Sequence, residues 1–104
     1  MGTAHFLAMA SRSYQPPADF VDEGGQWPVG PFVAQAPVYA RVTAALVVHL
    51  RAAIGEQSLR SVAVPAGIDP TSLSRLLTGK VVPDLATIAA LEQVLDVDLW
   101  PGRV

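Results

Sequence analysis

Residues 59–80 read LRSVAVPAGIDPTSLSRLLTGK, and this stretch carries the strongest fold signal in the chain. A helix-turn-helix needs a small residue where the second helix crosses the first. It also needs a glycine four residues later, because glycine reaches a positive φ at the turn without steric cost. Ala63 and Gly67 have this spacing. Asp69 and Pro70 then suit the N-cap and the first position of a second helix. The stretch therefore predicts two helices joined by a tight turn.

A further helix is predicted before this stretch, over residues 37–54. Its apolar residues recur at spacings of three and four, which is the period of a helix with one buried face. His49 belongs to this face, so we expect it to be buried, and Gly55 ends the helix. The predicted face comprises Val38, Val42, Ala45, Leu46, His49, Leu50 and Ala53.

Local signals also place the remaining helix boundaries. Ser58 is the expected N-cap of the helix that contains Ala63, and Pro65 predicts that this helix is short or kinked, because an internal proline removes a backbone hydrogen bond. The next helix is expected over residues 70–78, with Gly79 as its C-cap. A fourth is expected from Asp84 to about residue 96, and Asp98 is expected to cap a last short turn that Pro101 interrupts.

Residues 1–36 differ in composition from the rest of the chain. Prolines and glycines forbid a long helix here, while aromatic residues are too frequent for an ordinary disordered linker. One interpretation is a floppy extension, since Met9 could equally begin the protein. The other is an arm whose Trp27 and Phe32 pack on the helical core or on a partner subunit. A minor-groove arm is not expected, because Arg12 is the segment's one basic residue.

We therefore expect an all-α protein. It would be a compact bundle of about five helices containing a helix-turn-helix, with an irregular N-terminal arm over residues 1–36 and the helical domain over residues 37–104. A chain of 104 residues suits one such small domain.

Composition argues against catalysis and metal binding. The chain has no cysteine, so disulfides and cysteine-ligated zinc are impossible, and its two histidines are His5 and His49. No glycine-rich phosphate loop is present. We expect no enzymatic activity, no cofactor and no metal. The first ten residues lack the basic region of a signal peptide, and no stretch approaches the roughly eighteen apolar residues of a membrane helix, so we expect a cytoplasmic protein with no membrane partner.

Residues 58–101 resemble the Xre/Cro-type, lambda repressor-like helix-turn-helix domain. The run LSRLLTGK at residues 73–80, followed by Pro83, is similar to the end of that family's recognition helix and its next loop. With the preceding helix, the resemblance covers residues 38–101. It implies a sequence-specific, double-stranded DNA-binding transcriptional regulator, a repressor, that acts as a homodimer. Its half-site centres would lie about 34–36 Å apart on a pseudo-palindrome.

The resemblance also implies which residues meet DNA. In this docking mode the recognition helix lies in the major groove, and its outward residues meet base edges. Leu73, Leu76 and Leu77 are expected to face the core. The planar guanidinium of Arg75 suits guanine O6 and N7. The expected base contacts are Pro70, Thr71, Ser74 and Arg75, and the expected contacts to the DNA backbone are Ser58, Arg60, Thr78 and Lys80.

A protein-binding role remains the alternative. The net charge of −2 is unusual for a DNA-binding protein, although residues 37–104 carry equal numbers of basic and acidic side chains. Leu59 stands where the family usually has a polar residue that reaches the DNA backbone. The alternative is therefore an interaction module or an antitoxin-like protein that meets its partner through the N-terminal arm. A positive, open surface at residues 71–75 favours DNA, whereas an apolar surface or one covered by the arm favours protein.

Overall fold

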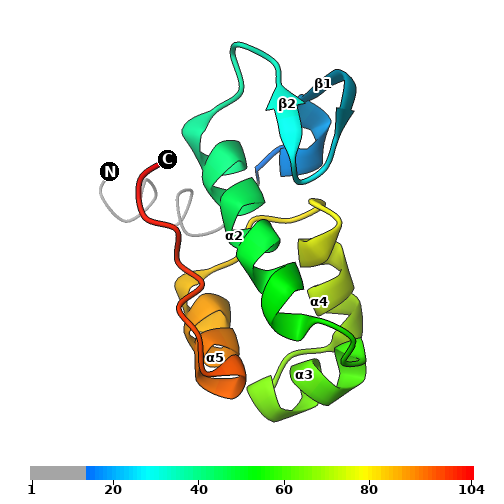
Figure 1. Cartoon of the computed structure of the whole chain (residues 1–104), viewed down its shortest axis with the longest axis vertical. Helices are drawn as coiled ribbons and strands as arrows, with labels where there is room; N and C mark the ends of the chain where they lie inside the picture. Colours follow the sequence, from blue (N-terminus) through cyan, green and yellow to red (C-terminus); the bar gives the residue numbers. More distant parts are fainter. Residues whose placement is uncertain (1–13) are drawn as a thin grey trace, which may run out of the picture.

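The computed structural model describes residues 14–104, so the expectations for His5, Met9 and Arg12 lie outside the described residues. Figure 1 shows a small hairpin at one end of the molecule and α3 at the other. In chain order the elements are the 3-10 helix η1 (Pro17–Phe20), strands β1 (Val21–Gln26) and β2 (Gly30–Phe32), and helices α2 (Val38–Ile54), α3 (Leu59–Ala66), α4 (Pro70–Leu77) and α5 (Leu85–Leu95).

The expectation of an all-α bundle of about five helices is wrong, because the described residues form four α-helices and a two-stranded antiparallel sheet. Val21 pairs with Phe32 and Gln26 with Gly30, with an irregular register between them. The Trp27 and Phe32 rings meet edge to face, with their centroids 6.4 Å apart. Prolines and glycines that exclude a helix are compatible with such short edge strands.

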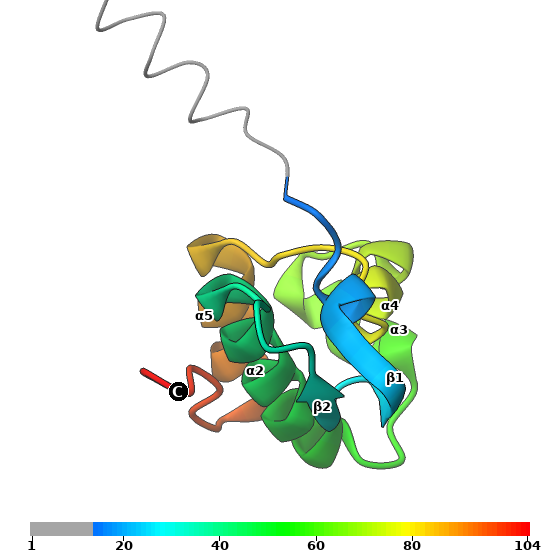
Figure 2. The ribbon, with the colours of Figure 1, turned by 90° about the horizontal axis from the view of Figure 1, so that it is seen from above.

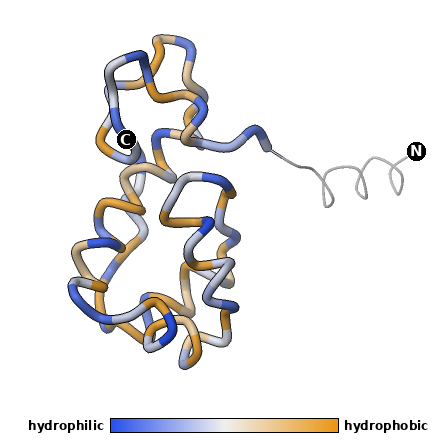
Figure 3. The backbone as a smooth tube through the Cα atoms, turned by 90° about the vertical axis from the view of Figure 1, so that its right-hand side faces the viewer, coloured by the Kyte–Doolittle hydropathy of each residue, from blue (hydrophilic) through white to orange (hydrophobic). Residues whose placement is uncertain are grey.

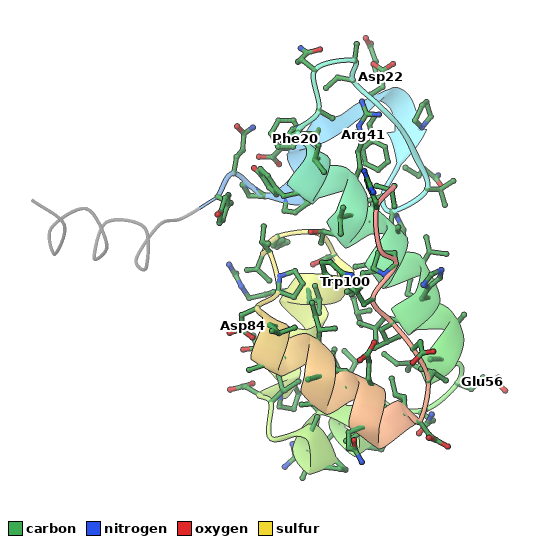
Figure 4. The ribbon with its side chains drawn as sticks, turned by 90° about the vertical axis from the view of Figure 1, so that its left-hand side faces the viewer. Phe20, Asp22, Arg41, Glu56, Asp84 and Trp100 are labelled. Atoms are coloured by element: carbon green, nitrogen blue, oxygen red, sulfur yellow. The ribbon has the colours of Figure 1, made fainter. Side chains whose placement is uncertain are left out.

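The expected fifth helix is also absent, since residues 96–104 contain no helical segment. The Glu92 carboxylate accepts the backbone N–H groups of Leu99 at 2.7 Å and Trp100 at 3.0 Å. Pro101 has no N–H to donate. The amides that would begin a helix are thus bound to α5 instead, and Leu99 is buried in the core. Figure 4 shows the segment with Trp100 running back along α5 and α2.

The local boundary signals are confirmed. The side chains of Ser58, Asp69 and Asp84 accept the backbone N–H groups of Ser61, Thr71 and Thr87, at 3.1, 2.8 and 2.8 Å. Hydrogen bonds from the side chain and backbone of Thr87 lower the pKa of Asp84. Pro65 lies in the last turn of α3, which is short, as predicted. Each helix of the helix-turn-helix therefore begins at the cap that the sequence indicates.

The buried face of α2 differs from the predicted one. His49 is exposed, so its predicted burial is wrong, and Val38 is exposed as well. The side chains that are buried belong to Ala40, Thr43, Ala44, Leu46, Val47, Leu50 and Ile54. Helical periodicity alone did not include η1, which packs against α2.

The four helices enclose one hydrophobic core. Figure 3 shows hydrophobic residues recurring along each helix, and the largest fully buried leucines are Leu46, Leu50, Leu73, Leu76, Leu91 and Leu99. Within residues 14–104 no single helix is long and apolar enough to span a membrane. Only α2 and α3 together reach that length, across a bend of 108°, and both supply core residues.

The C-terminal segment should be released at acid pH. The N–H groups of Trp100 and Leu99 lower the pKa of Glu92. Because a lowered pKa stabilises the fold only while the carboxylate is charged, the contribution is complete above the ordinary glutamate pKa of about 4.3 and is lost as pH falls through the lowered value. We expect the Leu99 and Trp100 amide proton resonances to move together below about pH 4. In Glu92→Gln these two amides should not titrate. Titration persisting in that variant would contradict the assignment.

Candidate nucleic-acid interface

The turn between α3 and α4 has the geometry that Ala63 and Gly67 predict. Ala63 is completely buried where α3 packs against α4, and Gly67 has a φ of 72°. The Gly67 N–H donates to Val64 O at 3.0 Å, and the Ile68 N–H donates to Ala63 O at 2.9 Å. This pair of bonds is a Schellman motif, which ends α3 and turns the chain into α4.

The two sides of α4 differ sharply in exposure. Leu73 and Leu76 are buried and Leu77 packs against the core, as predicted. On the other side Thr71 and Arg75 are exposed, and Pro70 and Ser74 are half-buried. Among the described residues, the side chains of Thr71, Ser74 and Arg75 form no hydrogen bond or ion pair. The outward side of α4 therefore presents two hydroxyls and one guanidinium that are free to meet a ligand.

Three cations lie on consecutive parts of this motif. Arg60 is in the first turn of α3, Arg75 is in α4, and Lys80 is in the loop that follows; all three are exposed. Within residues 14–104 none of them is paired with a carboxylate. The carboxylates of Asp69 and Asp84 are held as N-caps. These three cations can therefore neutralise phosphate without first breaking an ion pair.

The N-terminus of α3 also suits an anion. The Ser58 hydroxyl accepts the Ser61 N–H, which leaves its own proton free to donate. The structure gives no acceptor for the Leu59 and Arg60 amides among the described residues. Free amides at a helix N-terminus favour negative charge. The Leu59 side chain packs against the core, so its departure from the family pattern leaves no large apolar spot on this surface.

Thr78 is less available than the other expected contacts to the DNA backbone. Its hydroxyl donates to Ser74 O at 2.9 Å, within the last turn of α4. A phosphate could receive this proton only if that bond broke, because a hydroxyl has a single proton to donate.

A second Schellman motif terminates α4. Gly79, with a φ of 74°, donates its N–H to Leu76 O at 3.1 Å, and the Lys80 N–H donates to Arg75 O at 2.9 Å. The prediction of Gly79 as the C-cap is wrong by one residue: Thr78 is the C-cap, and Gly79 follows it with a positive φ. These bonds leave the carbonyl of Leu77 without a local partner.

The carbonyl oxygen of Leu77 accepts two hydrogen bonds from side chains elsewhere in the chain. Trp27 donates its indole N–H to it at 3.0 Å, and Arg51 of α2 donates a guanidinium N–H at 2.8 Å. Trp27 is half-buried and packs against the core, so the interpretation of the arm as a packed segment holds for this residue. No signal within residues 59–80 indicates this contact, because its donor lies 50 residues earlier in the sequence.

Gly79 lies directly against the N-terminal segment. The Ala18 N–H donates to Gly79 O at 2.9 Å. A Cβ at Gly79 would lie 2.6 Å from the Trp27 ring and 2.7 Å from Ala18 Cβ, distances that real Cβ atoms do not tolerate. Figure 2 shows η1 and β1 lying over this end of α4. Glycine is therefore required here for space as well as for φ.

Alanine substitutions at two glycines separate the requirement for a positive φ from the requirement for space. Gly67 and Gly79 share nearly the same φ, but a Cβ at Gly67 meets no atom within 4 Å. We expect Gly67→Ala to lower the free energy of unfolding by about 1 kcal/mol, the cost of a left-handed alanine. Gly79→Ala should lower it clearly further, since Trp27 and Ala18 must also move. Urea unfolding followed by circular dichroism measures both, and equal losses would refute the close packing at Gly79.

The comparison with protein families agrees with this geometry. A helix-turn-helix family matches residues 58–99, which comprise α3, α4, α5 and the segment to Leu99. The match thus begins at the Ser58 cap and ends at the buried Leu99. No curated protein matches the chain. Residues 58–99 thus match the Xre, lambda repressor-like helix-turn-helix family, whose domains bind DNA.

Proposed function

We propose that the protein is a sequence-specific regulator of transcription, a repressor, that binds double-stranded DNA as a homodimer. Helix α4 would lie in the major groove of each half-site. The observation that carries this proposal is the outward side of α4, where Thr71 and Arg75 are exposed and free of internal partners within a helix-turn-helix. A repressor of this kind acts on DNA at its operator, so the proposed location of the protein is the cytoplasm.

The outward residues of α4 provide the chemistry for reading bases. Arg75 would donate two hydrogen bonds to guanine O6 and N7, and Ser74 and Thr71 can donate or accept with any base edge. The Thr71 methyl and the Pro70 ring suit a thymine methyl group. Ser58, Arg60 and Lys80 would hold the DNA backbone, and Thr78 would join them only after releasing Ser74 O. Phosphate contacts fix position and base contacts give specificity.

No hydrogen bond of the described N-terminal segment ends on residues 71–75, the part of α4 proposed to contact DNA bases. Its bonds to α4 and the following loop end on Leu77 and Gly79, beyond residues 71–75. Leu59 is also committed to the core. Two of the three features that favoured a protein-binding role, Leu59 and the N-terminal arm, therefore have an internal structural explanation, whereas the net charge of −2 does not.

A second face does favour protein contact, and we propose that a second copy of this chain covers it. An apolar cavity of about 290 Å³ lies between α2 and the start of α5. Trp100, which lines this cavity, is 57% exposed. Leu85 follows two lining residues, Val82 and Pro83, in the sequence and is 77% exposed. Trp27, which the sequence offered as a residue that packs on the core or on a partner subunit, donates its indole N–H to Leu77 O of its own chain. The lining comprises Val38, Tyr39, Val42, Thr43, Leu46, Val82, Pro83, Ile88 and Trp100.

Point variants on a selected operator test the DNA-binding proposal. Arg75→Ala should relax preference at one base position, at a cost of about 1–3 kcal/mol in discrimination. Lys80→Ala should weaken binding to all sequences and reduce the slope of log affinity against log salt by about one. Arg103→Ala, which removes an exposed charge outside the matched domain, is the control. The docking proposal fails if the first two variants bind every sequence as wild type does.

Sedimentation equilibrium tests the dimer. We expect wild type to dimerise and Trp100→Gln to shift towards monomer, because the change removes exposed apolar area from the cavity edge. Val48→Gln is the matched control, since Val48 is 44% exposed on α2 but does not line the cavity. A wild-type monomer that binds DNA at one copy per site would contradict the dimer and leave this face to another protein.

A further inference from the structure

We infer that Trp27 is a positioning residue of the DNA interface: it holds the loop after α4 and, through that loop, places Lys80 against phosphate. The inference rests on the proposed function. It extends the DNA-binding unit beyond residues 58–99 to a hairpin that precedes them, because the contacts at the end of α4 come from residues 18 and 27.

The loop is attached to the N-terminal segment on both sides of Thr78. Leu77 O accepts from the Trp27 indole, and Gly79 O accepts from the Ala18 N–H. Gly79 also lies against the Trp27 ring and Ala18 Cβ. Lys80 is the next residue, and its exposed ammonium group has no partner among the described residues. The backbone that carries Lys80 is therefore fixed immediately before it.

Beyond Lys80 the loop has few other constraints. Residues 81–83 form no backbone hydrogen bond among the described residues, and regular structure resumes only at the Asp84 cap. Val81 packs against the core, but side-chain packing alone constrains a backbone less than hydrogen bonds at fixed lengths. The attachments at Leu77 and Gly79 thus act together with the Lys80 N–H bond to Arg75 O in fixing where Lys80 emerges.

Trp27 is itself rigidly placed. Its ring packs edge to face on Phe32 of β2, and Pro28, the next residue, is buried. Since Arg51 also donates to Leu77 O, losing the indole N–H leaves that carbonyl satisfied. Losing the ring, however, empties the space beside Gly79. Truncation of the ring should therefore loosen the loop while the helices stay folded.

A double-mutant cycle on the operator selected by wild type tests the positioning role. The four proteins are wild type, Trp27→Ala, Lys80→Ala and the double variant, titrated with DNA over a series of salt concentrations. We expect Trp27→Ala to weaken specific binding and to reduce the salt slope by about one, as loss of a phosphate contact does. Lys80→Ala should then cost at least about twofold less in the Trp27→Ala background than in wild type.

Arg41→Lys is the matched control. It removes the Arg41 guanidinium bond to Ala34 O, another side-chain attachment of the N-terminal segment, keeps the positive charge, and leaves Trp27 and the proposed dimer face in place. It should bind DNA as wild type does. If the costs of Trp27→Ala and Lys80→Ala are additive, Trp27 only stabilises the fold and the inference is overturned.

A measurement without DNA covers the case in which Trp27→Ala does not fold. In Trp27→Leu, which removes the ring but keeps an apolar side chain, amide hydrogen exchange at Gly79 and Lys80 should be faster than in wild type, while exchange at the remote capped amide of Thr87 should be unchanged. Unchanged exchange at Gly79 and Lys80 would overturn the inference. If wild type selects no DNA, the proposed function fails instead, and the exchange result still decides whether Trp27 controls the loop.

Discussion

The close crossing of α3 and α4 depends on two positions with little or no side chain. Ala63 is completely buried on α3, which packs against α4, and Gly67 reverses the chain at a φ of 72°. Ser58, Asp69 and Asp84 then begin α3, α4 and α5 at fixed residues. With both boundaries and crossing set, Leu73 and Leu76 point into the core and Thr71 and Arg75 point outwards. The proposed DNA surface follows from this backbone geometry before any charge is considered.

The end of α4 shows how a local motif acquires distant support. Its last carbonyls have no partner within the helix and must be satisfied by other groups. The Schellman motif at Gly79 satisfies Leu76 O and Arg75 O from the next residues, while Leu77 O depends on Trp27 and Arg51. A helix-turn-helix that could end its recognition helix alone is thus joined to a hairpin at the residues just before Lys80. This arrangement explains why aromatic residues are concentrated in a segment that otherwise resembles a linker.

The parts of the structure that the sequence predicts are those determined by neighbouring residues. N-caps, the Ala63–Gly67 spacing and the glycine after α4 act over a few residues, so helix boundaries and the inward side of α4 were predictable. The buried face of α2 was not, because it depends on packing partners distant in sequence such as η1, and His49 is exposed. The hairpin and the C-terminal segment also depend on distant partners, since Trp27 binds Leu77 and Glu92 captures the Leu99 and Trp100 amides. For the site, the exposure of Arg75 was predictable, whereas the contact of Trp27 with the loop was not.

A protein with a net charge of −2 must bind DNA through local rather than global electrostatics. Arg60, Arg75 and Lys80 are unpaired within the described residues, so the account requires sequence-specific binding that depends on the outward side of α4. The most direct test is enrichment from a random double-stranded DNA pool at two salt concentrations, with a Thr71→Ala/Ser74→Ala/Arg75→Ala triple variant as control. We expect wild type to enrich a palindromic motif that the triple variant does not enrich. No enrichment at low salt, or the same motif with both proteins, would contradict it.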